Sequence, residues 1–148
     1  MSDPRMYPDR PFLAVSAAII RDGRVLIARR NKGASTGAFT LPGGVVEAGE
    51  TLHEAVVREI REETGIVIEP IGLAGQREFI TRDGSGRVSR HFVILCFACR
   101  WVSGEGAPLL EELSELRWLR PEELVGLETT TEGLADIVDS AFRLIDAT

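Results

Sequence analysis

Three glutamates near the end of one stretch have the spacing best suited to chemistry. Glu59, Glu62 and Glu63 stand at positions i, i+3 and i+4, so on a helix they share one face and we expect them to converge on one spot. Leu52 and Val56 fall on the same face, which makes the acidic residues a continuation of the buried side. Carboxylates this close repel each other, and a hard divalent cation offsets the repulsion. The alternative is a solvated run of charges.

Local signals mark the elements that must position these glutamates. A helix is predicted to start after Thr51, which can cap it in a capping box with Glu54, and to end at Gly65. A short strand before the helix leads into the tight turn of Gly43 and Gly44. Glycines in this turn would let a backbone carbonyl approach a ligand closely.

The remaining chain alternates apolar stretches with turn residues, and no domain boundary interrupts it, so we expect one domain over residues 1–148. Residues 1–11 are polar and rich in proline, and we expect an irregular arm there. Residues 31–37 are predicted to form a loop. Strands are predicted over residues 12–20, 25–28, 39–41, 66–71, 73–81, 88–102 and 116–119, and a closing amphipathic helix over 131–145.

Composition narrows the class of partner. The chain has 148 residues, of which 44% are hydrophobic, and a net charge of −6, which argues against a general nucleic-acid-binding surface. A small anionic substrate is compatible with this charge if a metal reverses the local field. The N-terminus has no secretory pattern and no apolar run is long enough to span a bilayer, so we expect a cytoplasmic protein without a membrane partner.

The two cysteines are interpreted as core thiols. Cys96 and Cys99 lie three residues apart in a predicted strand, which places them on opposite faces. They therefore cannot easily bridge or share a metal, and no further cysteine pair completes a zinc site. Two buried thiols are typical of a reducing compartment.

One stretch follows a fixed spacing: Gly44, five residues, Glu50, seven residues, Arg58-Glu59-Ile60, one residue, Glu62-Glu63, one residue, Gly65-Ile66. It resembles the Nudix box over its full length. The resemblance implies an α/β fold, namely the Nudix α/β/α sandwich with a mixed β-sheet. It also implies hydrolysis of the pyrophosphate linkage in a nucleoside diphosphate derivative with Mg²⁺ or Mn²⁺. Within the box, Glu50 and Arg58 are expected to pair and to hold the loop against the helix.

The resemblance also implies roles for the acidic residues. Glu59, Glu62 and Glu63 become metal ligands, and the carbonyl of Gly43 becomes a backbone ligand. The base that activates water is expected to be Glu59 or Glu62, or a carboxylate from a later loop. Glu112 is preferred over Glu115 as this loop residue, and a solvated acidic loop is the alternative for either.

Two further residues are expected to touch the substrate. Arg30, at the end of the second predicted strand, resembles an arginine that contacts substrate phosphate in the family, and its alternative is an exposed strand-end arginine. His91 begins the longest predicted strand and can contact substrate from there. The alternative for His91 is a structural role at the strand end.

The substrate is indicated less clearly than the reaction. Residues 90–97, 101–105 and 117–119 resemble a bacterial branch of ADP-ribose pyrophosphatases, which implies ADP-ribose or a related nucleoside diphosphate sugar and allows a homodimer. A proline typical of the larger ADP-ribose pyrophosphatases is missing near Thr81-Arg82. The alternatives are a (d)NTP pyrophosphohydrolase that sanitises damaged nucleotides and a non-catalytic nucleotide-binding regulator, which usually lacks some of the glutamates of the box.

Overall fold

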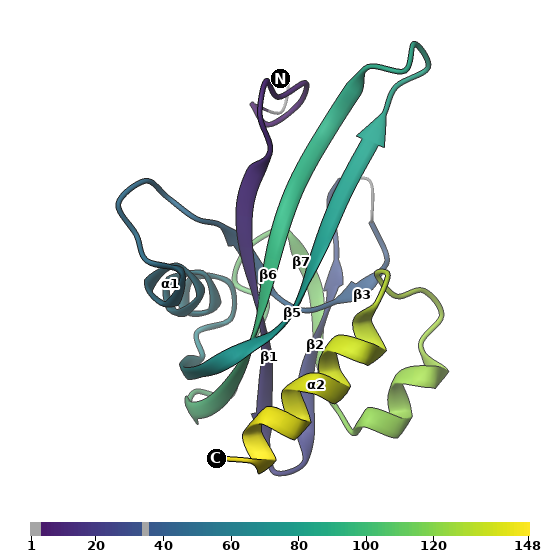
Figure 1. Cartoon of the computed structure of the whole chain (residues 1–148). Coiled ribbons are helices and arrows are strands. Elements are labelled where there is room, and N and C mark those ends of the chain that lie inside the picture. The colour runs from purple at the N-terminus through teal and green to yellow at the C-terminus, as the bar shows by residue number, and fades with distance from the viewer. Residues whose placement is uncertain (1–3, 34–35) are drawn as a thin grey trace.

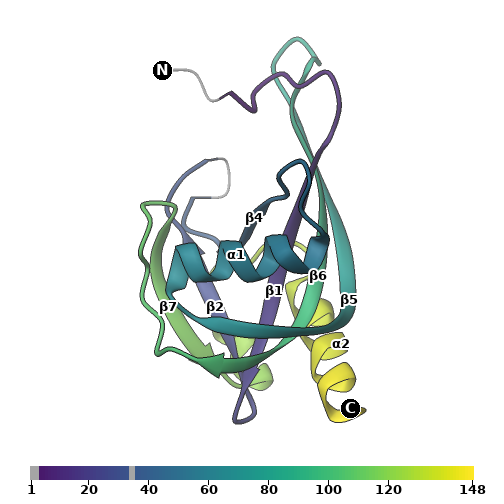
Figure 2. The same cartoon turned by 90° about the vertical axis from the view of Figure 1, so that its left-hand side faces the viewer.

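A twisted sheet separates two helices in the computed structural model, which describes residues 4–33 and 36–148 (Figures 1 and 2). Helix α1 covers one face and helix α2 the other. Over the described residues the elements are β1 Phe12–Arg21, β2 Arg24–Arg30, β3 Phe39–Thr40, β4 Gly43–Val45, α1 Leu52–Thr64, β5 Val67–Arg82, β6 Val88–Ser103, β7 Leu113–Leu119, the 3₁₀ helix η1 Pro121–Gly126 and α2 Leu134–Asp146.

The sheet is mixed, as the resemblance implies. Its main order is β3-β2-β1-β6-β5, and β7 pairs with β2. Strands β1 and β6 are parallel, whereas the other pairs are antiparallel. Strand β1 pairs with β2 at its end near Arg21 but with β4 over residues 14–16. The prediction of an α/β/α sandwich is therefore confirmed, and β4 carries the glycine turn into the sheet.

Each face of the sheet buries its own apolar core because side chains alternate along the strands. Val15, Ala17 and Ile19 of β1 pack toward α1, whereas Ala18 packs toward α2. Cys96 lies in the α2 core and Cys99 in the α1 core, both as free thiols. Burial raises the pKa of both thiols, and the prediction of two core thiols on opposite faces is confirmed.

Strand β5 differs from the prediction of two strands over residues 66–71 and 73–81. It is continuous from Val67 to Arg82 and absorbs the interruption as irregularities of register at residues 70–72 and 73–75. Together with β6 it forms a long hairpin that projects beyond the rest of the sheet (Figure 1). Bulges of this kind allow a strand to bend while it stays paired.

Helix α2 also begins later than predicted, at Leu134 instead of Thr131. The backbone N–H of Phe39 donates to the carbonyl of Thr129, and the N–H of Thr131 donates to the carbonyl of Phe39. These two bonds hold residues 129–131 in an extended path beside β3. Tertiary pairing has therefore overridden the helical periodicity of the sequence.

The N-terminal arm follows the prediction over its described part, residues 4–11, which contains turns and no helix or strand. Residues 1–3 of the predicted arm and 34–35 of the predicted loop lie outside the described part. Tyr7 fastens the arm to the β5–β6 hairpin: its N–H donates to Ser89 O at 2.8 Å and its hydroxyl to Asp83 at 2.9 Å. Among the described residues, no helix is both long and apolar enough to cross a lipid bilayer.

Candidate active site

Helix α1 is fixed at both ends by the signals read from the sequence. The Thr51 hydroxyl accepts a hydrogen bond from the Glu54 N–H at 3.1 Å, and the Glu54 carboxylate accepts one from the Thr51 N–H at 2.9 Å. Gly65 ends the helix in a left-handed conformation, and its N–H donates to Arg61 O. The predicted capping box and helix end are confirmed, so the position of each glutamate along the helix is well defined.

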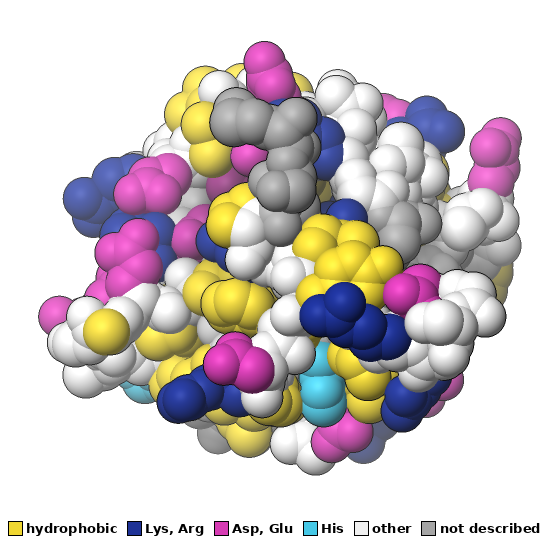
Figure 3. Space-filling view, turned by 90° about the horizontal axis from the view of Figure 1, so that it is seen from above, with side chains coloured by type: hydrophobic (Ala, Val, Ile, Leu, Met, Phe, Trp, Pro, Cys, Tyr) yellow, Lys and Arg dark blue, Asp and Glu magenta, His cyan; other side chains and the backbone are white. Residues whose placement is uncertain are grey.

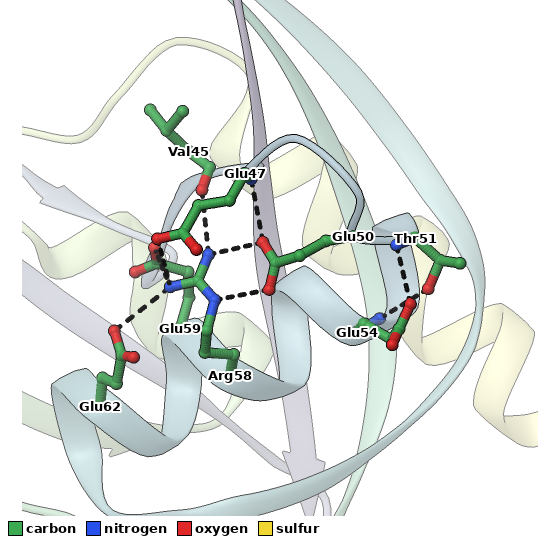
Figure 4. A network of polar contacts seen from close by, with 8 residues as sticks. All are labelled: Val45, Glu47, Glu50, Thr51, Glu54, Arg58, Glu59 and Glu62. Atoms are coloured by element: carbon green, nitrogen blue, oxygen red, sulfur yellow. Dashed lines mark hydrogen bonds and ion pairs between the residues drawn. The ribbon is translucent and has the colours of Figure 1, made fainter.

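Arg58 is the centre of the acidic helix face (Figure 4). Its Nε and Nη2 donate to both oxygens of Glu50 at 2.6 and 2.8 Å, and Nη2 also donates to Val45 O at 3.1 Å. Its Nη1 donates to Glu59 at 2.9 Å and to Glu62 at 3.2 Å. The hydrogen bonds from Arg58 and from the Glu47 N–H lower the pKa of Glu50 to about 2. The predicted Glu50–Arg58 pair is present, and Arg58 orients two more carboxylates than expected.

Glu63 points away from this network and toward the glycine turn. Its side chain is buried, and Oε1 accepts a hydrogen bond from the Gly43 N–H at 3.0 Å. Burial raises the pKa of Glu63 to about 8, and the nearby charge of Glu59 adds to this effect. A buried carboxylate with a single amide donor is costly to ionise. Glu63 is therefore the group in α1 whose charged form most needs a further positive partner.

The two glycines of the turn are required by close packing. A Cβ on Gly43 would lie 2.0 Å from the carbonyl oxygen of Val15, and a Cβ on Gly44 would lie 2.3 Å from the carboxylate of Glu59. Both distances are far below contact. The turn can therefore lie between β1 and the carboxylates only because neither residue has a side chain.

The three carboxylates near the C-terminal end of α1 have different hydrogen-bond partners in this structure. Among the described residues, no group of three or more His, Cys, Asp or Glu side chains is arranged to hold one ion. Arg58 draws Glu59 and Glu62 to one side, whereas Glu63 turns to Gly43. A shared helix face fixes the backbone positions, but long side chains diverge from it according to their hydrogen-bond partners.

The donor chemistry nevertheless fits a hard cation. Glu63 and Glu59 are carboxylates of low exposure on either side of the Gly43–Gly44 turn. Burial raises the pKa of both groups, so their ionised forms lack compensation from water. Oxygen ligands of this kind are those that Mg²⁺ and Mn²⁺ prefer.

A cleft of about 840 Å³ opens beside the glycine turn on the α2 face of the sheet. Glu63, Gly43 and Gly44 line one part of it, and Arg30 and Glu112 also face it. The structure thus brings Arg30 and Glu112 together with Glu63, as the predicted site requires. Glu59 and Glu62 do not line the cleft. They lie on α1 and accept hydrogen bonds from Arg58. Acidic and basic side chains are interleaved on this side of the surface (left in Figure 3).

His91 is placed differently from the prediction of a substrate contact. Its neighbours Arg90 and Phe92 line the cleft, whereas His91 does not. Successive residues of a strand point to opposite faces, so His91 faces the other side of β6. The structure gives His91 a place in the strand and no contact with the cleft.

The cleft also has lining residues that sequence reasoning missed, among them two arginines and two phenylalanines. Arg77 and Phe79 of β5 and Arg90 and Phe92 of β6 line one wall of the cleft. Alternation along 90–96 could have placed Arg90 and Phe92 on one face. Their pairing with β5 could not be read, because the irregularities of β5 shift its register.

Comparison with known proteins places the chain in a family. The family model described as the NUDIX domain matches residues 10–141. The chain belongs to the Nudix family.

Individual relatives agree with this assignment. An ADP-ribose pyrophosphatase of Methanocaldococcus jannaschii is 40% identical over 95 residues, which cover 64% of this chain and 54% of that protein. A MutT-like protein of Streptomyces ambofaciens is 37% identical over 150 residues, covering 99% of this chain and 84% of that protein. The chain thus spans about half the length of the first relative and most of the second.

A solved structure shows the same fold. The MutT NUDIX hydrolase of Burkholderia pseudomallei superposes with a TM-score of 0.77 at 29% identity, covering 89% of this chain and 98% of that one. The shared architecture is the mixed sheet with helices on both faces.

Proposed function

We propose that the protein is a Mg²⁺- or Mn²⁺-dependent hydrolase that cleaves the pyrophosphate linkage of a nucleoside diphosphate derivative. ADP-ribose or a related nucleoside diphosphate sugar is the proposed substrate class. The observation that carries the proposal is the buried carboxylate of Glu63 beside the Gly43–Gly44 turn, at the edge of a cleft of about 840 Å³. A volume of this size suits a nucleotide, and a relative named ADP-ribose pyrophosphatase supports the substrate class.

The proposed metal ligands are Glu59, Glu62, Glu63 and the carbonyl of Gly43. When bound, Mg²⁺ would neutralise the charge on the pyrophosphate oxygens and lower the pKa of a bound water. Arg58 holds the carboxylates of Glu59 and Glu62 in place.

The proposed proton acceptor is a carboxylate, either Glu59 or Glu62 on α1 or Glu112 on the far side of the cleft. Glu112 is exposed and lines the cleft with Glu63, so it can meet a water inside. Arg30 lines the same cleft and is proposed to hold a substrate phosphate during the reaction.

A hydrolysis screen tests this function. ADP-ribose, other nucleoside diphosphate sugars, dinucleotides and (d)NTPs are incubated with Mg²⁺ and the products are identified. Two monophosphates, AMP and ribose 5-phosphate, are expected from ADP-ribose. Glu59→Gln and Glu62→Gln are expected to lose activity because each removes a proposed ligand or base. Hydrolysis at the parent rate by both variants would rule the catalytic assignment out.

A (d)NTP pyrophosphohydrolase is the second candidate. The MutT-like relative matches nearly the whole chain, and several arginines line the cleft, which favours a highly charged substrate. Release of free pyrophosphate from a triphosphate would identify this activity.

A further inference from the structure

One wall of the cleft is built from cross-strand rows of β5, β6 and β1. In one row Phe79 pairs with Phe92, which in turn pairs with Phe12. The ring centroid of Phe92 lies 6.5 Å from that of Phe79 and 5.8 Å from that of Phe12. Cross-strand partners share a face of the sheet, so this row forms a continuous aromatic strip.

An arginine stands on each side of the strip. Arg77 belongs to the next row in one direction, paired with Ile94, and Arg90 to the next row in the other, paired with Thr81. Arg77, Phe79, Arg90 and Phe92 all line the cleft. The wall thus alternates guanidinium, aromatic and guanidinium groups, an arrangement that suits a ligand with a flat ring and an anionic group.

Arg30 joins these two arginines from the opposite side of the cleft. Nη1 of Arg90 and Nη2 of Arg30 lie 3.1 and 3.5 Å from the position that a Cβ would take on Gly33. Burial lowers the pKa of Arg30, and the positive charges of Arg90 and Arg77 lower it further, while Glu63 opposes them. Three like charges therefore share one region and destabilise each other.

Two of the three guanidinium groups form no ion pair with a carboxylate of the described residues. The Arg30 guanidinium donates only to the carbonyl of Lys32, at 3.4 Å, and the Arg77 guanidinium makes no hydrogen bond or ion pair with the described part of the chain. Lys32, by contrast, is neutralised by Glu111 at 2.9 Å. The chain carries 23 acidic residues, so the uncompensated charge does not result from a shortage of carboxylates. An anionic ligand would supply the compensation.

We call the wall formed by Arg77, Phe79, Arg90 and Phe92 the basic wall. Its strands, β6 and β5, are not adjacent to β4, which carries the glycine turn. Val45 of β4, Ala14, Ile94 and Arg77 form one row across four strands. Three strand spacings of about 4.8 Å separate the backbones of Val45 and Arg77 by roughly 14 Å. Strands β1 and β6 therefore separate the backbone that carries Arg77 from the strand that carries the glycine turn.

We propose that Arg77 and Arg90 bind a phosphate that the substrate carries in addition to the two phosphates of the cleaved linkage. Arg30 lies between this pair of arginines and Glu63. This inference rests on the proposed hydrolase function and narrows its substrate class. The additional phosphate is separated from the linkage by the nucleoside, as a 2′- or 3′-phosphate on its ribose is. Phe79 and Phe92 contact the nucleoside.

Matched substrate pairs test the proposal. ADP-ribose is compared with ADP-ribose 2′-phosphate, and dephospho-coenzyme A with coenzyme A, by kcat/KM in Mg²⁺. We expect the phosphorylated member to be preferred about 10- to 100-fold, mainly through KM, as charge-assisted bonds to phosphate imply. The pair ADP and ATP, whose extra phosphate adjoins the linkage, should show no comparable preference.

Variants locate the preference on the wall. Arg77→Gln and Arg90→Gln are expected to bring the ratio within a pair close to one. Arg24→Gln is the matched control, because Arg24 is exposed and lies outside the cleft lining, and it should leave the ratio unchanged. Thermal unfolding of each variant verifies that the fold is retained.

Two outcomes would overturn the proposal: a ratio near one in the parent protein, or an unchanged ratio in Arg77→Gln, either with no loss of kcat/KM or with an equal loss for both members of a pair. The last result would mean that the arginines contact the cleaved linkage itself. If no substrate is hydrolysed, calorimetry with adenosine 2′,5′-bisphosphate and AMP tests the subsite separately from the function. Tighter binding of the bisphosphate that Arg77→Gln abolishes would support the subsite, and equal binding of the two ligands would refute it.

Discussion

At the scale of single residues, the glutamates in and around the candidate site have different environments. Glu50 accepts two bonds from Arg58 and its pKa falls to about 2, whereas burial raises the pKa of Glu63 to about 8. Glu112 is exposed at the cleft and belongs to neither network. The same functional group can therefore brace the loop, bind a cation or accept a proton, depending on its partners.

The raised pKa of Glu63 predicts a pH dependence of stability. Between pH 4.5 and about 8 the folded protein keeps a proton that the unfolded chain has released, so the free energy of unfolding falls as pH rises through this window. Glu63→Gln removes the effect. In EDTA, the variant should gain on the order of 5 kcal/mol relative to the parent between pH 4 and pH 8.5, measured by urea unfolding. A pH-independent difference would contradict the assignment.

Glu112 should matter for turnover more than for binding if it accepts the proton of the attacking water. We expect Glu112→Gln to lower kcat about 100-fold with little change in KM, the usual contribution of a general base. Glu122→Gln is a suitable control, because Glu122 is exposed on η1 and outside the cleft lining. Parent-like kcat in Glu112→Gln would leave Glu59 or Glu62 as the proposed base.

At the scale of elements, the site depends on how closely β4 approaches both β1 and α1. The pairing of Gly43 with Ser16 brings the turn into the sheet, and the absence of side chains lets Glu59 rest against Gly44. The capping box fixes the start of α1 and Arg58 ties the helix to Val45 O. Helix, turn and strand therefore form one unit, and a change in the turn is felt by the carboxylates.

Substitutions of the two glycines are expected to affect different properties, activity in one case and stability in the other. In Gly44→Ala the new methyl group displaces the Glu59 carboxylate, and we expect kcat/KM to fall about 100-fold with the fold retained. In Gly43→Ala the methyl group meets the backbone of β1, which cannot move aside, so a lower Tm is expected. Gly84→Ala is the control for both, since no atom lies within 4 Å of its Cβ position. Equal activity in Gly44→Ala and Gly84→Ala would contradict the prediction.

At the scale of the whole molecule, the features that depend on residues close in sequence were predicted correctly. The caps of α1, the Glu50–Arg58 pair and the opposite faces of Cys96 and Cys99 depend on residues close in sequence, and all were anticipated. The direction of each carboxylate was not anticipated, because it is determined by hydrogen-bond donors on Arg58 and Gly43.

Contacts between distant segments account for the other differences. Tyr7 meets Asp83 across 76 positions of the chain, and the path of residues 129–131 is set by Phe39. Which residues form the basic wall can be derived only when the register of β5 on β6 is known. Hydrophobic periodicity contains no information on such pairings, so the fold was more predictable than the composition of the cleft.

The location of Gly33 between two guanidinium groups has a consequence for engineering. Its φ of +81° belongs to the left-handed region, which aspartate tolerates better than most residues. A carboxylate introduced there by Gly33→Asp would extend toward Arg30 and Arg90 and occupy the place of a ligand anion. The chain could thus be converted into its own tethered competitor, with a blocked cleft and an unaltered Nudix box.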